Sequence, residues 1–107
     1  MIVKTGRNYR FIHLDDVQWI EAEGNYLRVY IGEDSFLIRE TLRNLECKLD
    51  KDRFIRINRS AIVNIECIKE LRTLKYSKYL VVLDNDKSWV WGQTFNEALK
   101  RIKSEAY

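Results

Sequence analysis

The side chain with the most accessible chemistry in this sequence is Arg59, at the centre of an Asn58–Ser60 tip between two apolar runs. Ile55 and Ile57 alternate with polar residues before the tip, and this period of two predicts a strand that leads into a turn. A guanidinium on a rigid β turn can form paired hydrogen bonds with a phosphate or with the edge of guanine. Nucleic acid is therefore the first partner to consider.

Two further predicted loops, Gly24–Tyr26 and Gly92–Thr94, carry polar side chains directly after a predicted strand. Each has a simpler structural explanation, because Asn25 tolerates a left-handed turn and Thr94 can cap a helix. Arg59 has no turn function that requires arginine. The functional interpretation therefore depends most on Arg59 and gains from the three loops taken together.

Residues for catalysis or metal binding are not recognisable. His13 is the only histidine, and no nucleophile with an orienting acid accompanies it. The acidic runs Asp15–Asp16 and Asp84–Asp86 are typical of turns, and the second lacks the glycine and the distal glutamate of a calcium loop. No phosphate-binding glycine loop or nucleophile elbow is present. The sequence predicts no enzyme activity, no cofactor and no metal site.

The composition is that of one soluble globular domain, which we expect to span residues 1–107. Hydrophobic residues make up 46% and charged residues 33% of the 107 residues. The net charge of +3 comes from 19 basic and 16 acidic residues, so a basic surface must arise from placement. Cys47 and Cys67 lack paired metal-site spacing and are expected to be buried, reduced thiols. No apolar run approaches the roughly 20 residues that span a bilayer, and we expect a cytoplasmic protein without membrane contact.

Periodicity and turn residues predict mainly strands along the chain. The predicted strands are Met1–Lys4, Tyr9–Ile12, Val17–Ala22, Tyr26–Ile31, Ser35–Arg39, the two arms of Arg53–Asn64, Cys67–Leu71, Tyr79–Leu83 and Ser88–Trp91. Thr41 can cap a short helix with Leu42, Leu45 and Leu49 on one face. Thr94 and Glu97 fit a capping box that opens a terminal helix.

Three blocks of residues together resemble the LytTR DNA-binding domain of bacterial transcription regulators. They are Trp19–Tyr26, Phe54–Asn64 and Gly92–Phe95, with Thr41–Leu42 opening the helix between the first two. The resemblance implies a mainly β fold, an elongated antiparallel framework of several small sheets with one short internal helix and a short C-terminal helix. It also implies that loops, and not a recognition helix, enter the DNA grooves.

Carried over by position, the resemblance implies which residues would contact DNA. Base contacts would come from Asn25 or Tyr26, from Arg59, and from Gln93 or Thr94, with Asn58 and Ser60 beside Arg59. Arg28, Arg39 and Arg56 are expected to contact phosphates. The family often follows a receiver domain of a two-component system and binds direct-repeat promoter sites, often as a homodimer, and we expect no small-molecule substrate.

This sequence departs from the family pattern at two places. Asn58 stands where histidine is common, and Gly92-Gln93 stands where Ser-Arg is common. Glutamine pairs with adenine where arginine pairs with guanine, so the base preference of the third loop is left open.

The alternative function is a protein interaction or dimerisation module that uses exposed sheet edges with Trp89 and Trp91. A third possibility, a single-strand binder, requires a row of exposed tyrosines. We expect most of Tyr26, Tyr30, Tyr76 and Tyr79 to pack in the core instead.

Overall fold

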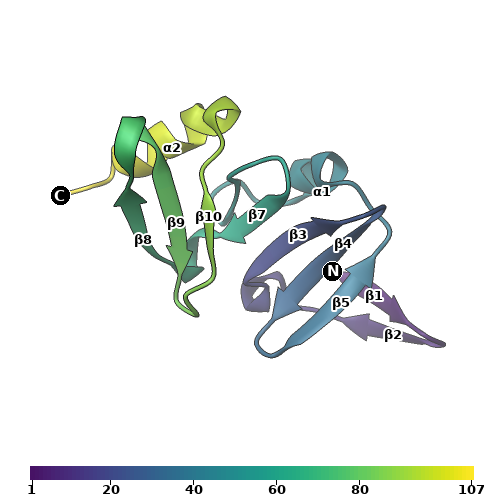
Figure 1. The fold of residues 1–107 in the computed structure, drawn as a ribbon. Helices are drawn as coiled ribbons and strands as arrows, with labels where there is room; N and C mark the ends of the chain where they lie inside the picture. Colours follow the sequence, from purple (N-terminus) through teal and green to yellow (C-terminus); the bar gives the residue numbers. More distant parts are fainter.

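The structure is a computed structural model, and it describes all residues from 1 to 107. Ten strands form three antiparallel sheets, and two short helices complete the chain (Figure 1). The molecule measures 48 Å along its longest axis and 24 and 22 Å along the others. This confirms the predicted mainly β, elongated framework of several small sheets with one internal and one C-terminal helix.

The central sheet has five strands in the order β5-β4-β3-β7-β6. Its strands are β3 (Trp19–Glu23), β4 (Tyr26–Ile31), β5 (Asp34–Ile38), β6 (Phe54–Arg56) and β7 (Ala61–Asn64). A hairpin of β1 (Ile2–Thr5) and β2 (Asn8–Phe11) precedes it. A three-stranded sheet follows, with β8 (Ile68–Thr73), β9 (Tyr79–Leu83) and β10 (Ser88–Val90).

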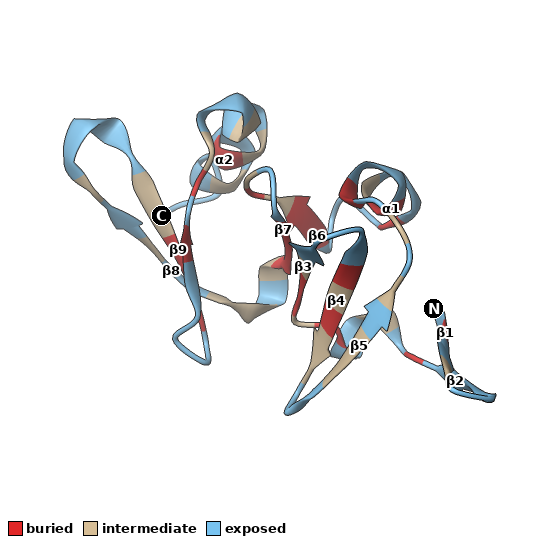
Figure 2. Cartoon of the chain, turned by 45° about the vertical axis from the view of Figure 1, so that its right-hand side comes forward, coloured by how far each residue is buried: buried red, intermediate tan, exposed pale blue.

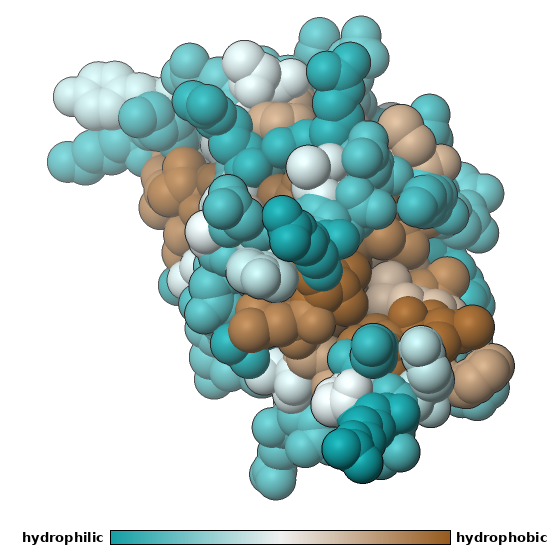
Figure 3. All heavy atoms as spheres, turned by 90° about the vertical axis from the view of Figure 1, so that its right-hand side faces the viewer, coloured by the Kyte–Doolittle hydropathy of each residue, from teal (hydrophilic) through white to brown (hydrophobic).

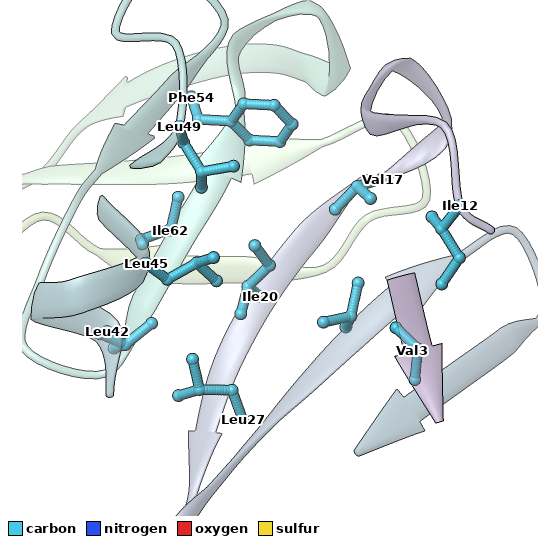
Figure 4. Packing of buried hydrophobic residues seen from close by; sticks show 11 residues of the cluster. Val3, Ile12, Val17, Ile20, Leu27, Leu42, Leu45, Leu49, Phe54 and Ile62 are labelled. Atoms are coloured by element: carbon cyan, nitrogen blue, oxygen red, sulfur yellow. The ribbon is translucent and has the colours of Figure 1, made fainter. Parts of the chain in front are cut away.

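Alternation along the central strands gives the five-stranded sheet two apolar faces, and each face has its own core (Figure 2). Ile20 and Ile62 point to the face that packs against α1 and the hairpin (Figure 4). Their neighbours Trp19 and Val63 point to the opposite face and pack with residues of the three-stranded sheet and α2. The central sheet is therefore the layer that fixes the two ends of the molecule relative to each other.

The internal helix α1 (Leu42–Lys48) forms as the sequence predicts. The Thr41 hydroxyl oxygen accepts a hydrogen bond from the Asn44 backbone N–H at 3.1 Å, which caps the first turn. Leu42, Leu45 and Leu49 are buried against the central sheet. This packing holds the first turn of α1 beside the β3–β4 loop.

The predicted capping box at Thr94 is wrong. A 3-10 turn, η4 (Gln93–Phe95), comes first, and α2 (Asn96–Lys103) begins after it with Phe95 at the N-cap and no side-chain cap. Thr94 therefore lies inside a turn and not before one. The turn is closed by the Phe95 N–H, which donates to the Gly92 carbonyl at 3.0 Å, so Thr94 is free of a capping role.

Three expectations about burial are also wrong. Trp89 in β10 and Trp91 just after it are both buried in the second core, so they form no contact surface. Cys47 is exposed, since it lies off the leucine face of α1, while Cys67 is half-buried; both thiols are free. Only two of the four tyrosines pack against a core: Tyr30, which stacks on Trp19, and Tyr79 are half-buried beside the second core. Tyr26 on β4 and Tyr76 between β8 and β9 are exposed.

Burial raises the pKa of the Cys67 thiol, and the carboxylates of Asp84 and Glu66 raise it further. Cys67 therefore stays protonated and weakly nucleophilic at neutral pH. Neither helix has the length and apolar character that crossing a bilayer requires.

Candidate nucleic-acid interface

Strand register brings the three predicted contact loops to one edge of the molecule. Leu27 pairs with Ile38, which places Arg39 beside the Gly24–Tyr26 loop. The Ala22 N–H donates to the Ser60 carbonyl at 2.8 Å, which ties the middle loop to the same end of β3. We call this edge the loop edge. It consists of the first loop (Gly24–Tyr26), the segment Arg39–Arg43, the middle loop (Asn58–Ser60) and the third loop (Gly92–Thr94).

An open groove of about 630 Å³ runs along the loop edge between the β3–β4 loop, the start of α1 and the middle loop. Asn25 and Tyr26 line one side of it. Four arginines also line it, namely Arg39, Arg43, Arg56 and Arg59. Glu40 is the single carboxylate among the lining residues, so the groove has a strong excess of positive charge.

Arg43 belongs to this groove, although sequence reasoning missed it. The helical pattern places Arg43 off the leucine face of α1, and the structure shows it exposed. Its position in the sequence could have indicated it, because Arg43 comes two residues after the Thr41 cap, in the first turn of the helix that follows β5. What the sequence does not show is that this turn lies across a groove from Asn25.

Glu40 is tied to the helix start and is not paired with the groove arginines. Its carboxylate accepts hydrogen bonds from the Thr41 N–H at 2.8 Å and from Asn44 Nδ2 at 3.1 Å. Lys48 Nζ lies 3.4 Å from the same carboxylate. These donors, the Thr41 N–H first, lower the pKa of Glu40, so it is ionised at neutral pH.

The middle loop is braced from within by Arg56. Its Nε donates to the Asn58 carbonyl at 3.2 Å and its Nη2 donates to the Arg59 carbonyl at 3.0 Å. Glu46 Oε1 lies 3.4 Å from Nη1, and the guanidinium carbon lies 5.3 Å from the centre of the Phe95 ring. With only 18% of its side chain exposed, Arg56 has most of its donors turned toward the protein.

Asn58 joins the middle loop to the third one. Its Oδ1 accepts from the Ser60 N–H at 2.8 Å and from the Ser60 hydroxyl at 3.0 Å, while Nδ2 donates to the Val90 carbonyl at 3.3 Å. The Gly92 N–H donates to the Ile57 carbonyl at 2.7 Å. The two loops are therefore held side by side.

Gly92 and Asn58, the two departures from the family pattern, are in direct contact. A Cβ at Gly92 would lie 3.3 Å from the Asn58 Cα and Cβ and 3.1 Å from Phe95 Cδ2, closer than ordinary van der Waals contact. The backbone at position 92 is extended, with φ −75°, so its conformation does not require glycine. The glycine is thus matched to the close approach of Asn58.

Arg59 and Asn25 have no structural duty in the fold. Arg59 is exposed, and its side chain makes neither an ion pair nor a hydrogen bond within the protein. In the first loop Gly24 takes the positive φ of 60°, and Asn25 does not, so the turn explanation for Asn25 is wrong. Both side chains lie free to contact a ligand in the groove.

Arg28 lies outside the groove. Its Nε is 2.6 Å from Glu23 Oε2, and its Nη1 donates to the Ser35 hydroxyl oxygen at 2.9 Å. The hydrogen bond from Arg28 lowers the pKa of Glu23. Because this cation is neutralised by its partner, Arg28 is the weakest phosphate candidate among the predicted residues.

Gln93 and Thr94 are exposed on the η4 turn, which Trp91 steadies by donating its Nε1–H to the Phe95 carbonyl at 2.9 Å. Thr94 lines a second groove of about 600 Å³ with Arg56, Glu46 and Arg101. The two grooves are separate, and Arg56 lines both. The structure therefore places Gln93 and Thr94 beside the middle loop but not in the groove of Asn25.

The opposite ends of the same strands carry most of the turn carboxylates, and we call this the acidic edge. It comprises Asp15 and Asp16 in the 3-10 turn η1 (Leu14–Asp16), Glu33 in the β4–β5 turn with Asp34 at the start of β5, Glu66 in η2 (Ile65–Cys67), and Asp84 and Asp86 in the β9–β10 turn. Figure 1 shows both β turns at the lower side, away from α1 and η4. Arg53 pairs with Asp15 there and Lys69 pairs with Asp86, which neutralises part of the edge, whereas Asp16, Glu33, Glu66 and Asp84 have no ion-pair partner. The small net charge is therefore unevenly distributed between the two edges.

Comparison with known proteins identifies the family. The family model described as the LytTr DNA-binding domain matches residues 7–104. The solved LytTr DNA-binding domain of a putative methyl-accepting/DNA response regulator from Bacillus cereus superposes with a TM-score of 0.83 at 26% identity, covering 96% of this chain and 94% of that one.

Curated relatives give the same result. The sensory transduction protein LytT of Bacillus subtilis is 26% identical over 95% of this chain, and the heme-containing CO-sensing transcriptional regulator RcoM 1 of Paraburkholderia xenovorans is 33% identical over 78%. The chain spans only 42% and 32% of the lengths of these two proteins. This chain belongs to the LytTR family of DNA-binding domains.

Proposed function

We propose that this domain reads a specific duplex DNA sequence with its loop edge, by inserting the three loops into the grooves. The observation that carries the proposal is the groove in which Arg39, Arg43 and Arg59 stand beside Asn25 with a single carboxylate among them. Arginine and asparagine are side chains that form bidentate hydrogen bonds with guanine and adenine, respectively. An exposed cationic groove also suits the phosphates that flank such bases.

The side chains divide into readers and supports. Arg59 and Asn25 are free and are proposed to contact base edges, with Tyr26 beside them. Gln93 on the η4 turn is proposed to read a second position, and adenine is the base that suits its amide. Thr94 and Ser60 are proposed to contact the backbone nearby, since hydroxyls commonly bond to phosphate oxygens.

Arg39 and Arg43 are proposed to contact phosphates, because both are exposed at the groove. Arg56 and Asn58 instead set the position of Arg59, because each is bonded to the middle-loop backbone. Arg28 remains a phosphate candidate only if DNA displaces Glu23. This division predicts that losing a reader alters base preference, whereas losing a phosphate contact weakens binding to every sequence.

For the whole protein we propose the output function of a bacterial transcription regulator, with the domain placed behind a receiver of a two-component system. The DNA response regulator of the matched structure and the name of the LytT relative support this proposal. We further propose direct-repeat promoter sites, two copies of the chain on them, action in the cytoplasm, and no catalytic activity or small-molecule substrate. The relatives named above are sensory and transcriptional regulators, which is what supports these points.

Selection of binding sites from random duplexes, repeated at low and at moderate salt, tests the proposal. We expect one enriched motif, found twice in the same orientation, and binding that weakens steeply as salt rises. Selection that enriches no duplex sequence at either salt concentration would overturn the proposed function.

A second candidate function, protein contact, is favoured by the outer face of the β1–β2 hairpin. Ile2, Tyr9 and Phe11 are 59%, 65% and 76% exposed there. Figure 3 views this side of the molecule and shows apolar side chains gathered among hydrophilic ones. Sedimentation of the wild type and of a Phe11→Ser variant at two salt concentrations tests this contact. Self-association of the wild type that persists at high salt and is lost in the variant would support protein contact through the hairpin.

A further inference from the structure

The tip of the β8–β9 hairpin, residues Leu74–Lys78, has an unusual backbone. Tyr76 has φ 60° and ψ 38°, and Ser77 has φ 57°, within the 3-10 turn η3 (Lys75–Ser77). This left-handed region is unfavourable for residues with a Cβ, and glycine is the residue that adopts it freely. Because the Tyr76 side chain is 89% exposed, packing inside the domain does not explain a tyrosine here.

This tip lies at the same end of its sheet as the third loop of the loop edge. Val90 pairs with Leu80, and the Trp91 N–H donates to the Tyr79 carbonyl at 2.9 Å, so Gly92 leaves the sheet beside the tip. In Figure 1 the β8–β9 turn rises on the side of the molecule that also carries η4, the middle loop and α1. None of the three contact loops includes it.

The tip is also the cationic end of the three-stranded sheet. Arg72, Lys75 and Lys78 lie between Leu71 and Leu83, and no carboxylate occurs in that stretch. Arg72 is paired with Glu70 at 2.8 Å, which leaves the two lysines of the tip without an ion pair. The turn at the other end of the sheet contains Asp84 and Asp86 instead.

We propose that Lys75, Tyr76 and Lys78 contact the sugar–phosphate backbone of the duplex, beyond the bases read by the three loops, on the side of Gln93. The inference rests on the proposed function and extends its footprint. Lysine and the tyrosine hydroxyl are typical phosphate contacts that carry no base preference. With the long axis laid along the duplex, its 48 Å correspond to about 14 base pairs at about 3.4 Å each, which is long enough for flanking contacts outside the reading loops.

The first test removes the two lysines. The plot of log affinity against log salt has a negative slope, and the double variant Lys75→Ala/Lys78→Ala should make it shallower by about 1.8, at about 0.9 per phosphate contact. The selected base sequence should stay unchanged. The matched control is Lys69→Ala/Lys87→Ala, which removes the same charge from the acidic end of the same sheet, where these lysines face Asp86 and Glu21. The control should keep the wild-type slope.

The second test separates contact from folding. Tyr76→Gly gives the tip the residue that its backbone favours, so its melting temperature should be no lower than that of the wild type, while its affinity for the duplex falls. Trimming the duplex flank on the Gln93 side should abolish the difference between the wild type and both tip variants.

Equal salt slopes for the two double variants, or wild-type affinity of Tyr76→Gly, would overturn this inference while leaving the proposed function intact, provided that Arg59→Ala still weakens binding. If the wild type binds no duplex at all, the proposed function fails and this inference fails with it.

Discussion

The two long edges of this domain are built from the ends of the same strands, yet they differ in charge and in how they are made. At the acidic edge the strands are joined by short turns that contain Asp15, Glu33 or Asp86. At the loop edge it leaves the sheet in loops whose side chains are arginine and amides, and a groove opens between them. Charge placement, and not total charge, therefore distinguishes the surface that we propose for DNA.

The loop edge also contains an internal contrast. The middle and third loops are held together through Asn58 and Gly92, and the Arg56 guanidinium donates hydrogen bonds to the backbone of the middle loop. The first loop, with Asn25, has no such support. A loop backbone that is already held in place loses less freedom on binding, so we expect Arg59 to contribute more to affinity than Asn25.

The largest effect is expected from Arg59→Ala on the selected duplex. Loss of a bidentate base contact should cost about 1–3 kcal/mol of binding free energy and relax the preference at one base pair. Arg7→Ala, which removes the same charge from the exposed β1–β2 turn, should bind as the wild type does. Titration of labelled duplex measures both. Equal losses in the two variants would mean that charge alone matters and that the loop edge is not special.

A smaller effect is expected from glycine substitutions at the two edges. Gly92→Ala places a Cβ against Asn58 and Phe95, which should cost about 1 kcal/mol of folding free energy and also weaken DNA binding by separating the two loops. Gly32→Ala meets no atoms but must keep φ 56°, so it should cost a similar roughly 1 kcal/mol. Urea unfolding and duplex titration distinguish them, since only Gly92→Ala should affect binding; unaltered binding by Gly92→Ala would separate the third loop from the site.

Substitution of Asn58 tests the hydrogen bonds that hold the middle loop in place. Asn58→Ala removes the acceptor for the Ser60 N–H and the donor to the Val90 carbonyl, and should cost about 1 kcal/mol of stability. Because Arg59 is then held less firmly, affinity should fall without a change in the preferred base. A variant whose base preference changes instead would show that Asn58 is itself a reader.

The smallest effect is expected from Glu40→Gln, which removes the only carboxylate of the groove. Repulsion toward phosphates decreases, so binding should tighten several-fold at low salt and converge with the wild type as salt rises. Weaker binding by this variant would place the phosphates elsewhere.

The pH dependence of folding follows from the same carboxylate. The pKa of Glu40 is lower in the folded protein, so its stabilising contribution is present above the unfolded pKa, about 4.3, and is lost as pH falls through the folded value. Below about pH 4.3, the free energy of unfolding of the wild type should therefore fall more steeply with decreasing pH than that of Glu40→Gln. Parallel curves would contradict the role of Glu40 at the helix start.

Local features of the fold were predictable, and features that depend on distant residues were not. The strands around Gly24 and the Thr41 cap follow from neighbours in the sequence. The pairing of Trp19 with Val63, the burial of Trp89 against Trp19 and the position of Arg43 across from Asn25 depend on how segments distant in sequence pair and pack. No local pattern encodes that packing.

The candidate site divides in the same way. Arg59 could be proposed as a contact residue from its place in a turn that does not need arginine. The supporting role of Arg56 could not, because alternation places it on the polar face and says nothing of the carbonyls it bonds. Similarly, the contact between Asn58 and Gly92 joins residues that look like unrelated departures in the sequence.

The most direct test of the loop edge is a map of backbone amide chemical shifts on addition of the selected duplex at moderate salt. We expect the largest shifts on residues 24–26, 39–43, 58–60 and 92–94, and we expect the amides of Asp15, Glu33 and Asp84 at the acidic edge to stay unchanged. Shifts that concentrate at the acidic edge or on the β1–β2 hairpin would contradict it.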